Sequence, residues 1–291
     1  MYWETMREEQ FTQELANNGC LCALPISSLE KHGQHLPVGT DGYILDAVIA
    51  EALKIEDTVI FPTSCWLGDI SAPVTTSADG KPRWRGAIEL DADLQLTLLE
   101  NLCDEIRRNG FRKILLIAKQ PATAAVLSVL LRQLGYNKRD YAIMTTRAIN
   151  PTVSTPARIL ETVTARRSDF PMITDEDLNT LAQWATQGVT AAAFDTALML
   201  ACQETLVAQN RYPTEKNRPA YSLDTYHADT ITFSGIQNLQ YPNIACADVP
   251  QGCTKSIGQA ILKINAEHLA AIFRLLKEDE KCLAIVNRKT S

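Results

Sequence analysis

Residues 27–41 read Ser-Ser-Leu-Glu-Lys-His-Gly-Gln-His-Leu-Pro-Val-Gly-Thr-Asp, and the rest of the chain is arranged around this stretch. An apolar run from Cys20 to Ile26 precedes it and predicts a buried strand. Apolar residues at helical spacing follow it from Tyr43 to Lys54 and predict a helix. The polar stretch therefore lies at the carboxyl end of a strand, where open α/β sheets bind their ligands.

The spacing of the polar residues points to a metal ion. Glu30 and His32 are two positions apart, so in an extended segment both side chains leave the same face of the chain. Asp41 stands at the start of the predicted helix, from which its carboxylate can turn back. Two carboxylates and an imidazole suit a divalent transition metal such as Zn²⁺ or Mn²⁺. The plainer alternative is that Asp41 only caps its helix and that His32 and His35 only bond to loop backbone groups.

The pattern Glu-x-His-Gly-x-His-Leu-Pro-x-Gly-Thr-Asp, from Glu30 to Asp41, resembles the signature loop of the creatininase (creatinine amidohydrolase) family at every fixed position. This resemblance implies that Glu30, His32 and Asp41 are ligands of a two-metal site, with Asp41 bridging the ions. It implies that His35 is not a usual ligand. It also implies hydrolysis of carbon–nitrogen bonds in cyclic amides or related small molecules, and assembly into a homo-oligomer, commonly a hexamer.

Two later markers of that family are altered in this chain. Gln120 occupies the position of a metal-ligating His, and a Gln carbonyl binds hard cations but is a poorer donor to zinc. Thr190 stands where the family carries another His, and Asp195 stands where it carries a Glu near the metals. The shorter Asp195 carboxylate could act through a water. The predicted metal ligands are Glu30, His32, Asp41, Gln120 and Asp195.

Carboxylates gathered in this way need a positive charge nearby. Glu30, Asp41 and Asp195 would raise one another's pKa values if no cation were present. Either a metal ion neutralises them, or the ammonium of Lys119 substitutes for a missing ion, and in that case we expect Lys119 to point at the carboxylates.

Three functions stay open from the sequence. The first is a metal-dependent hydrolase that holds one or two divalent ions, Zn or Mn. The second is a catalytically silent relative that serves as a structural or binding subunit of an oligomer. The third is a small-molecule binding protein that kept the pocket and lost the chemistry.

Strand, turn and helix alternate along the chain. Helices are predicted over 4–18, 43–54, 93–109, 122–134, 175–186 and 261–276, strands over 20–26, 58–62, 111–118 and 141–145, and a loop over 150–156. This order predicts a three-layer α/β/α fold with a mostly parallel central sheet. The family resemblance implies that residues 1–291 form one creatininase-like domain. Leu94, Leu98, Leu102 and Ile106 are expected on the buried face of the 93–109 helix.

Composition limits the partners of the chain. Its net charge is -6 with both signs interspersed, so no basic block is present to bind nucleic acid. Acidic residues near the start and the lack of an apolar run of ~18 residues argue against a signal sequence and a membrane span, and favour a cytoplasmic protein. The family resemblance implies a small-molecule substrate. The eight scattered cysteines indicate buried thiols rather than disulfides.

A few isolated residues carry weaker signals. Trp66, Trp84 and Arg85 either wall a pocket or pack beside a loop, and His227 and His268 stand apart from the other polar residues. The chain has no nucleophile elbow, no phosphate-binding Gly-rich loop and no dinucleotide fingerprint, so serine hydrolase, NTPase and dehydrogenase functions lack support.

Overall fold

The computed structural model describes residues 1–64, 86, 88, 90–119, 127–133, 140–213 and 250–284. In the first half of the chain the elements are η1 (Trp3–Thr5), α1 (Glu8–Asn17), β1 (Leu21–Ile26), α2 (Thr40–Leu53), β2 (Val59–Ile60), α3 (Ala92–Arg108), β3 (Lys113–Ala118) and β4 (Ala142–Arg147). In the second half they are α5 (Pro151–Ser154), α6 (Pro156–Ala165), η2 (Arg167–Asp169), α7 (Asp175–Gln187), α8 (Ala191–Cys202), η3 (Glu204–Leu206), η4 (Gln209–Arg211) and α10 (Lys255–Glu278). Residues 127–133 are also helical.

The described strands form a 4-stranded sheet in the order β2-β1-β3-β4. Every pairing in it is parallel, and β1 pairs with β3 from Leu21 opposite Lys113 to Ile26 opposite Ala118. All six side chains of β1 and of β3 are buried, as expected for strands covered on both faces. The strands therefore end together, and the loops that follow them meet at one edge of the sheet.

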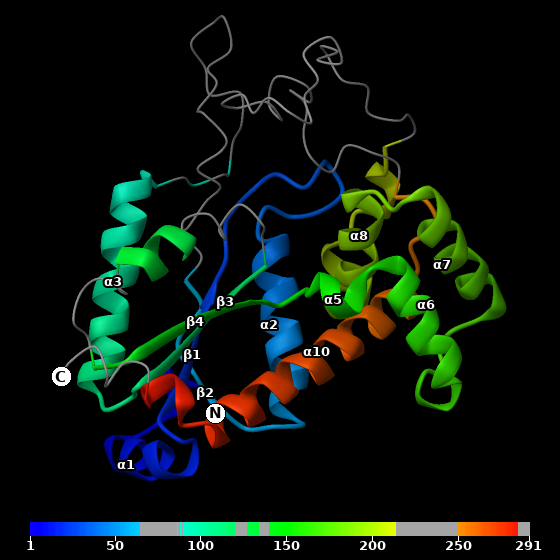
Figure 1. Cartoon of the computed structure of the whole chain (residues 1–291). Helices are drawn as coiled ribbons and strands as arrows, with labels where there is room; N and C mark the ends of the chain where they lie inside the picture. Colours follow the sequence, from blue (N-terminus) through cyan, green and yellow to red (C-terminus); the bar gives the residue numbers. More distant parts are fainter. Residues whose placement is uncertain are drawn as a thin grey trace, which may run out of the picture.

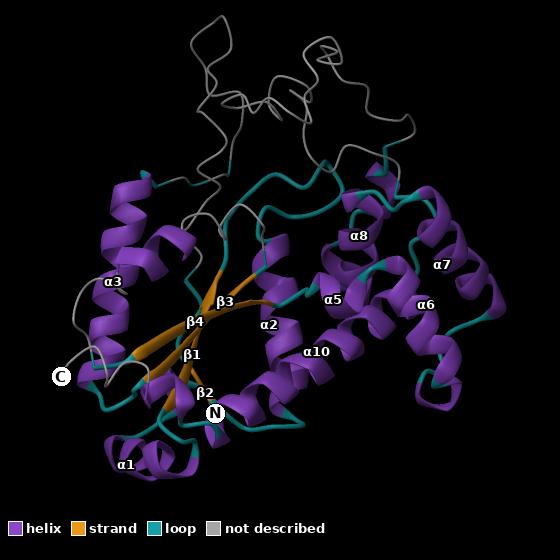
Figure 2. Cartoon of the chain, in the orientation of Figure 1, coloured by secondary structure: helices purple, strands orange, loops and turns teal. Residues whose placement is uncertain are grey.

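One face of the sheet is covered by α1 and α3 (Figures 1 and 2). Leu99, Cys103 and Ile106 of α3 pack there against the outward residues of β1 and β3. Of the expected face, Ile106 is fully buried and Leu98 and Leu102 pack partly buried against this cluster, whereas Leu94 is 52% exposed and Leu99 and Cys103 take the fully buried positions. Apolar residues occur on two adjoining stripes of α3, and the sheet selects one of them.

The opposite face is covered by α2 and α10 (Figure 1). Leu45, Val48 and Ile49 of α2 pack with Leu269 and Phe273 of α10 against this face. Helices on both faces of a parallel sheet confirm the predicted α/β fold.

Beyond α2, helices α5 to α8 pack with the first half of α10 into a separate hydrophobic cluster (Figure 2). Here the sequence prediction needs a correction, because the loop expected over 150–156 contains the short helix α5. Asn150 caps it by accepting a hydrogen bond from the backbone N–H of Thr152, and Pro151 occupies its first position. The predicted start of α7 is confirmed, since Thr174 and Asp177 form a capping box.

Helices α8 and α10 approach each other very closely. At Gly258 an added β-carbon would lie 1.8 Å from the backbone oxygen of Ala197, so only glycine fits the crossing. None of the helices in the described ranges combines the length and apolar character needed to cross a bilayer. The cysteines that the structure describes are free thiols, and Cys22 and Cys103 among them are buried; Cys65 and Cys246 lie outside the described residues.

Candidate metal centre

The polar loop leaves the carboxyl end of β1 and is closed by backbone contacts. The N–H of Glu30 donates to the carbonyl of Val38 across 2.9 Å, and Leu29 forms an antiparallel bridge with Ile88. Gly33 has a φ of 78°, a left-handed conformation that glycine adopts without strain. These contacts turn the chain back on itself between Glu30 and the start of α2.

Three polar side chains converge in this loop. Each of Glu30, His32 and Asp41 offers one ligand atom, and these atoms lie within 4.8 Å of one another. His32 is 4% exposed and Asp41 is fully buried, while Glu30 is partly exposed. Two carboxylates and one imidazole, drawn together in a mostly buried place, fit a divalent transition metal.

Asp41 does not cap its helix. The N-cap of α2 is Gly39, the helix begins at Thr40, and Asp41 lies in the first turn with its side chain in the interior. The Ser28 hydroxyl donates to Asp41 Oδ2 across 3.3 Å. The capping alternative for Asp41 is therefore wrong, since its carboxylate faces the loop.

Asp195 joins the cluster from α8. Its Oδ2 lies 3.7 Å from His32 Nδ1, while His32 Nε2 lies 3.6 Å from Asp41 Oδ1. The helix starts just before it, where the Thr190 hydroxyl accepts a hydrogen bond from the N–H of Ala193. Thr190 thus caps α8, and this cap holds Asp195 in the second turn with its side chain toward the loop.

Lys119, directly after β3, lies between the two aspartates. Its Nζ is 2.6 Å from Asp41 Oδ1 and donates to Asp195 Oδ1 and Oδ2 across 2.9 and 3.0 Å. The Lys119 side chain is 11% exposed, so these ion pairs are shielded from water. The expected direction of Lys119, toward the carboxylates, is confirmed.

The ion pairs shift the pKa values of both partners. Burial alone would raise the pKa of Asp41, but the Lys119 ammonium and the His32 ring outweigh it and hold this pKa far below the usual range. Burial alone would lower the pKa of Lys119, but Asp195 and Asp41 raise it above that of an ordinary lysine. Both groups are therefore charged at neutral pH.

His35 ties the loop to α8 and does not face the cluster as a ligand. Its Nε2 lies 2.9 Å from the Thr196 hydroxyl, its ring meets Tyr212 edge-on at 5.2 Å, and its carbonyl accepts from the N–H of Ala208. Burial, and then the nearby His32, lower the pKa of His35. The sequence did not predict this contact, because Thr196 is 161 positions away.

Several of the residues singled out in the sequence fall outside the described part of the chain. Gln120 is outside the described residues, so its place in the cluster stays a prediction, and the same holds for Trp66, Trp84, Arg85 and His227. His268 is a half-buried residue of α10, away from the cluster in sequence.

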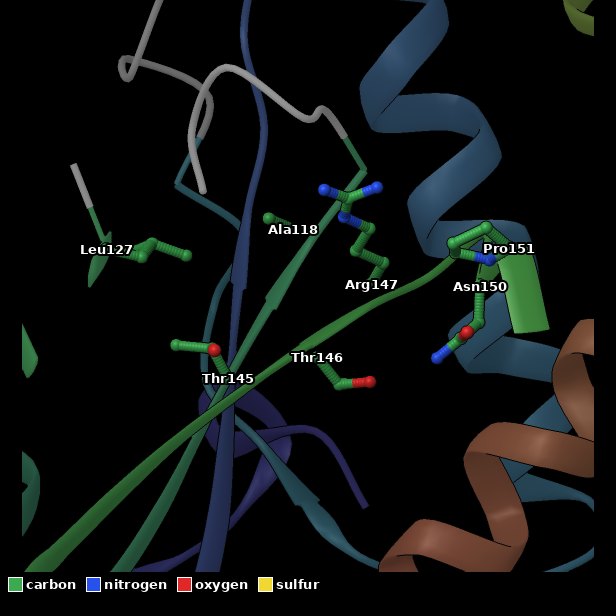
Figure 3. Close-up of a pocket in the computed structure, with 7 residues that line it drawn as sticks. All are labelled: Ala118, Leu127, Thr145, Thr146, Arg147, Asn150 and Pro151. Carbon is green, nitrogen blue, oxygen red and sulfur yellow. The ribbon is translucent and has the colours of Figure 1, made fainter. Parts of the chain in front are cut away.

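A cavity of about 280 Å³ opens near the ends of β3 and β4 (Figure 3). Its lining is formed by Ala118, Leu127, Thr145, Thr146, Arg147, Asn150 and Pro151. The described part of the chain places no acidic side chain in an ion pair with Arg147. One of its lining residues, Ala118, immediately precedes Lys119 in the sequence.

Comparisons with known proteins give a consistent result. A family model named Creatininase, described as creatinine amidohydrolase, matches residues 4–273. A solved structure described as creatinine amidohydrolase (creatininase) has a TM-score of 0.67 at 18% identity, covering 96% of this chain and 98% of that chain. A structure named "Creatininase Mn" has a TM-score of 0.67 at 18% identity, covering 96% and 99%.

A mutant creatininase described as Zn-Zn type has a TM-score of 0.66 at 18% identity, covering 96% of this chain and 98% of that chain. The search of curated proteins returned no match. At these identities the solved structures establish a shared fold, and the family model covers nearly the whole chain.

Proposed function

Because the chain belongs to the creatininase family, we propose that it is a metal-dependent hydrolase of a carbon–nitrogen bond in a cyclic amide or related small molecule. The observation that supports this most directly is the convergence of Glu30, His32 and Asp41 within 4.8 Å at the carboxyl end of β1. The donor set mixes carboxylate oxygen with imidazole nitrogen, so Zn²⁺ and Mn²⁺ are the ions that fit it best. A bound divalent ion supplies Lewis-acid activation of water and of the amide carbonyl.

The residues of the chain would bind the ion and orient its ligands. Glu30, His32 and Asp41 would hold the ion, and Gln120 and Asp195 are the further ligands we assign to it. His32 is kept in place by carboxylates on both sides, Asp41 at 3.6 Å and Asp195 at 3.7 Å. A buried imidazole between two acids is well oriented before any ligand arrives, which lowers the cost of assembling the site.

We place the substrate in the cavity at the carboxyl ends of β3 and β4. Arg147 offers guanidinium donors, and Thr145 and Thr146 offer hydroxyl groups, on the wall of a space of about 280 Å³. These groups suit carbonyl or carboxylate oxygens of a small molecule. Arg147→Gln should raise KM with little change in kcat, while Arg158→Gln, on the exposed surface of α6, should change neither.

The experiment that tests the proposal combines elemental analysis with a screen for hydrolysis of cyclic amides. We expect about one equivalent of zinc or manganese per chain, and hydrolysis that a chelator abolishes. His32→Ala should lose both the metal and the activity, whereas His268→Ala, on α10, should keep both. A metal-loaded chain that is inactive against the whole panel would contradict the hydrolase.

A second candidate function follows from the ammonium of Lys119, which neutralises Asp41 and Asp195 without a metal ion. It is a catalytically silent subunit of an oligomer. This candidate predicts no bound metal even after purification in metal-supplemented buffer, and a defined assembly by light scattering. We propose a cytoplasmic homo-oligomer, a hexamer by family resemblance, for either function; a monomer would contradict the silent subunit.

A further inference from the structure

Two acidic side chains from distant elements share one ammonium group in the interior. Asp41 comes from the first turn of α2 and Asp195 from α8, and Lys119 Nζ lies within 3.0 Å of oxygens from both. The side chains of Asp41, Asp195 and Lys119 are 0%, 9% and 11% exposed. Such an arrangement is an internal ion pair that water screens poorly.

The Asp41 carboxylate takes part in two arrangements. Asp41 is one of the three residues whose ligand atoms converge with those of Glu30 and His32. Its Oδ1 also lies 2.6 Å from Lys119 Nζ. A divalent ion bound by Asp41 would lie only a few ångströms from this ammonium, and two positive charges at that separation in a buried place repel strongly.

Lys119 is also well suited to hold its position. It follows directly after β3, whose six residues are all buried in the middle of the sheet. The ammonium has three donors, and the two aspartates accept from it. The ammonium is therefore part of a side chain next to a buried strand, so it cannot dissociate from the site as a free ion would.

We propose that Lys119 is a resident cation that competes with a divalent metal ion for Asp41 and Asp195. The chain consequently binds at most one metal ion, and it does so more weakly than it would without the lysine. This inference rests on the metal site of the proposed function, but it concerns the affinity and number of ions rather than the reaction.

Binding of Mn²⁺ to the full-length metal-depleted protein tests the proposal. Lys119→Met removes the charge and keeps a side chain of similar length, so it should bind Mn²⁺ at least about tenfold more tightly than the wild type, measured by calorimetry. Lys119→Arg keeps the charge and should bind no more tightly than the wild type. Lys54→Met, which removes an exposed lysine paired with Glu51 at the far end of α2, should leave the affinity unchanged.

The melting temperature gives a second readout. Metal-depleted Lys119→Met should melt below the wild type, and saturating Mn²⁺ should restore most of the loss. The proposal is overturned if Lys119→Met binds Mn²⁺ no more tightly than the wild type, or if the wild type binds two ions.

If Lys119→Met does not fold, the competition can be tested on the wild-type protein by chemical labelling. Acetylation of lysines by an N-hydroxysuccinimide ester, followed by mass spectrometry, should spare Lys119 in the metal-depleted protein and label it when Mn²⁺ displaces the ammonium. Labelling that is the same with and without bound Mn²⁺ would overturn the competition.

These outcomes separate the inference from the hydrolase function. An inactive wild type with tighter metal binding by Lys119→Met would contradict the hydrolase and support the resident cation. An active wild type whose metal affinity is unchanged by Lys119→Met would support the hydrolase and overturn the resident cation.

Discussion

The two ends of β3 each carry a buried lysine, and the two lysines have different partners. Lys113, at the start of the strand, is fully buried and donates to the backbone carbonyls of Leu276 and Lys277 across 2.9 and 3.3 Å. Lys119, just past the end of the strand, is paired with Asp41 and Asp195. The positions are six apart, so both side chains lie on the face of the sheet that α2 and α10 cover.

The difference lies in what each ammonium neutralises. Lys113 meets carbonyls at the end of α10, which carry only partial charge and have no partner within the helix. Within the described part of the chain its acidic partner is Glu280, which is largely exposed. Lys119 meets two whole negative charges in the interior. Lys113, at the start of β3, therefore stabilises the end of α10, whereas Lys119, just past the end of β3, determines the charge of the candidate metal centre.

The largest effect is expected from Lys119→Met in the absence of metal. It leaves Asp41 and Asp195 without a cation, and an unpaired buried charge costs about 3–5 kcal/mol of unfolding free energy. Urea unfolding of the metal-depleted protein measures it, with Lys119→Arg as the charge-conserving control. A loss below about 1 kcal/mol would mean that Lys119 does not neutralise two buried charges and is no more important for stability than Lys113.

Lys113→Met should cost less, about 2–3 kcal/mol, because it removes hydrogen bonds from a charged donor but leaves no buried charge behind. Urea unfolding again measures the loss, and Lys277→Met is the control for a lysine at the same helix end that is itself only partly buried. The affinity for Mn²⁺ should not change in Lys113→Met. A change in affinity as large as that of Lys119→Met would erase the distinction between the two lysines.

The stability difference between the wild type and Lys119→Met should depend on pH at both extremes. Burial opposes the shift, but the pKa of Asp41 is lowered, so its pairing stabilises fully above the ordinary value of about 3.9 and is lost as the pH falls below it. Burial lowers the pKa of Lys119, but Asp195 and Asp41 outweigh it and raise this pKa. The pairing is therefore complete below about pH 10.4 and is lost as the pH rises above that value.

The difference should therefore be constant between about pH 5 and 9, and should shrink by about 1–2 kcal/mol by pH 3. Urea unfolding at pH 7, 5 and 3 measures it. A difference that grew as the pH fell would contradict the charged pair. The Lys113→Met difference should vary less in this range, because backbone carbonyls do not titrate.

The smallest effect is expected where the loop is tied to α8. Thr196→Val keeps the shape of the side chain and removes the hydroxyl that lies 2.9 Å from His35 Nε2, at a cost of about 1 kcal/mol. Thr186→Val, on the exposed side of α7, is the control in thermal and urea unfolding. If the loss matched that of Lys119→Met, this neutral contact would matter as much as the ion pairs.

Much of the fold could be predicted because its signals are local. The strand β1, the loop after it and the helix α2 follow from an apolar run, a polar stretch and helical spacing within residues 20–54. The short helix α5 was missed because its Ser/Thr/Pro composition is also typical of loops, and the proline that suggested a loop occupies the first turn of a helix.

The site could be predicted in part. Glu30, His32 and Asp41 lie close together in sequence, so their convergence is a short-range matter, and Asp195 and Lys119 were placed beside them through family resemblance and charge. The contacts of His35 with Thr196 and of Lys113 with α10 left no signal in a single sequence. Lys113 reaches carbonyls more than 160 positions away, and any lysine in an apolar run would have looked the same.

Gly258 allows α10 to lie close against α8, the helix that carries Asp195. Because a β-carbon there would collide with Ala197, any larger residue must push α8 away from α10, and Asp195 sits only two residues before the point of collision. The absence of a side chain at Gly258 on α10 thus influences the distance between Asp195 on α8 and the Lys119 ammonium. Among relatives, loss of this glycine should therefore covary with changes at positions 119 and 195, because a wider spacing between α8 and α10 would alter the ion pair.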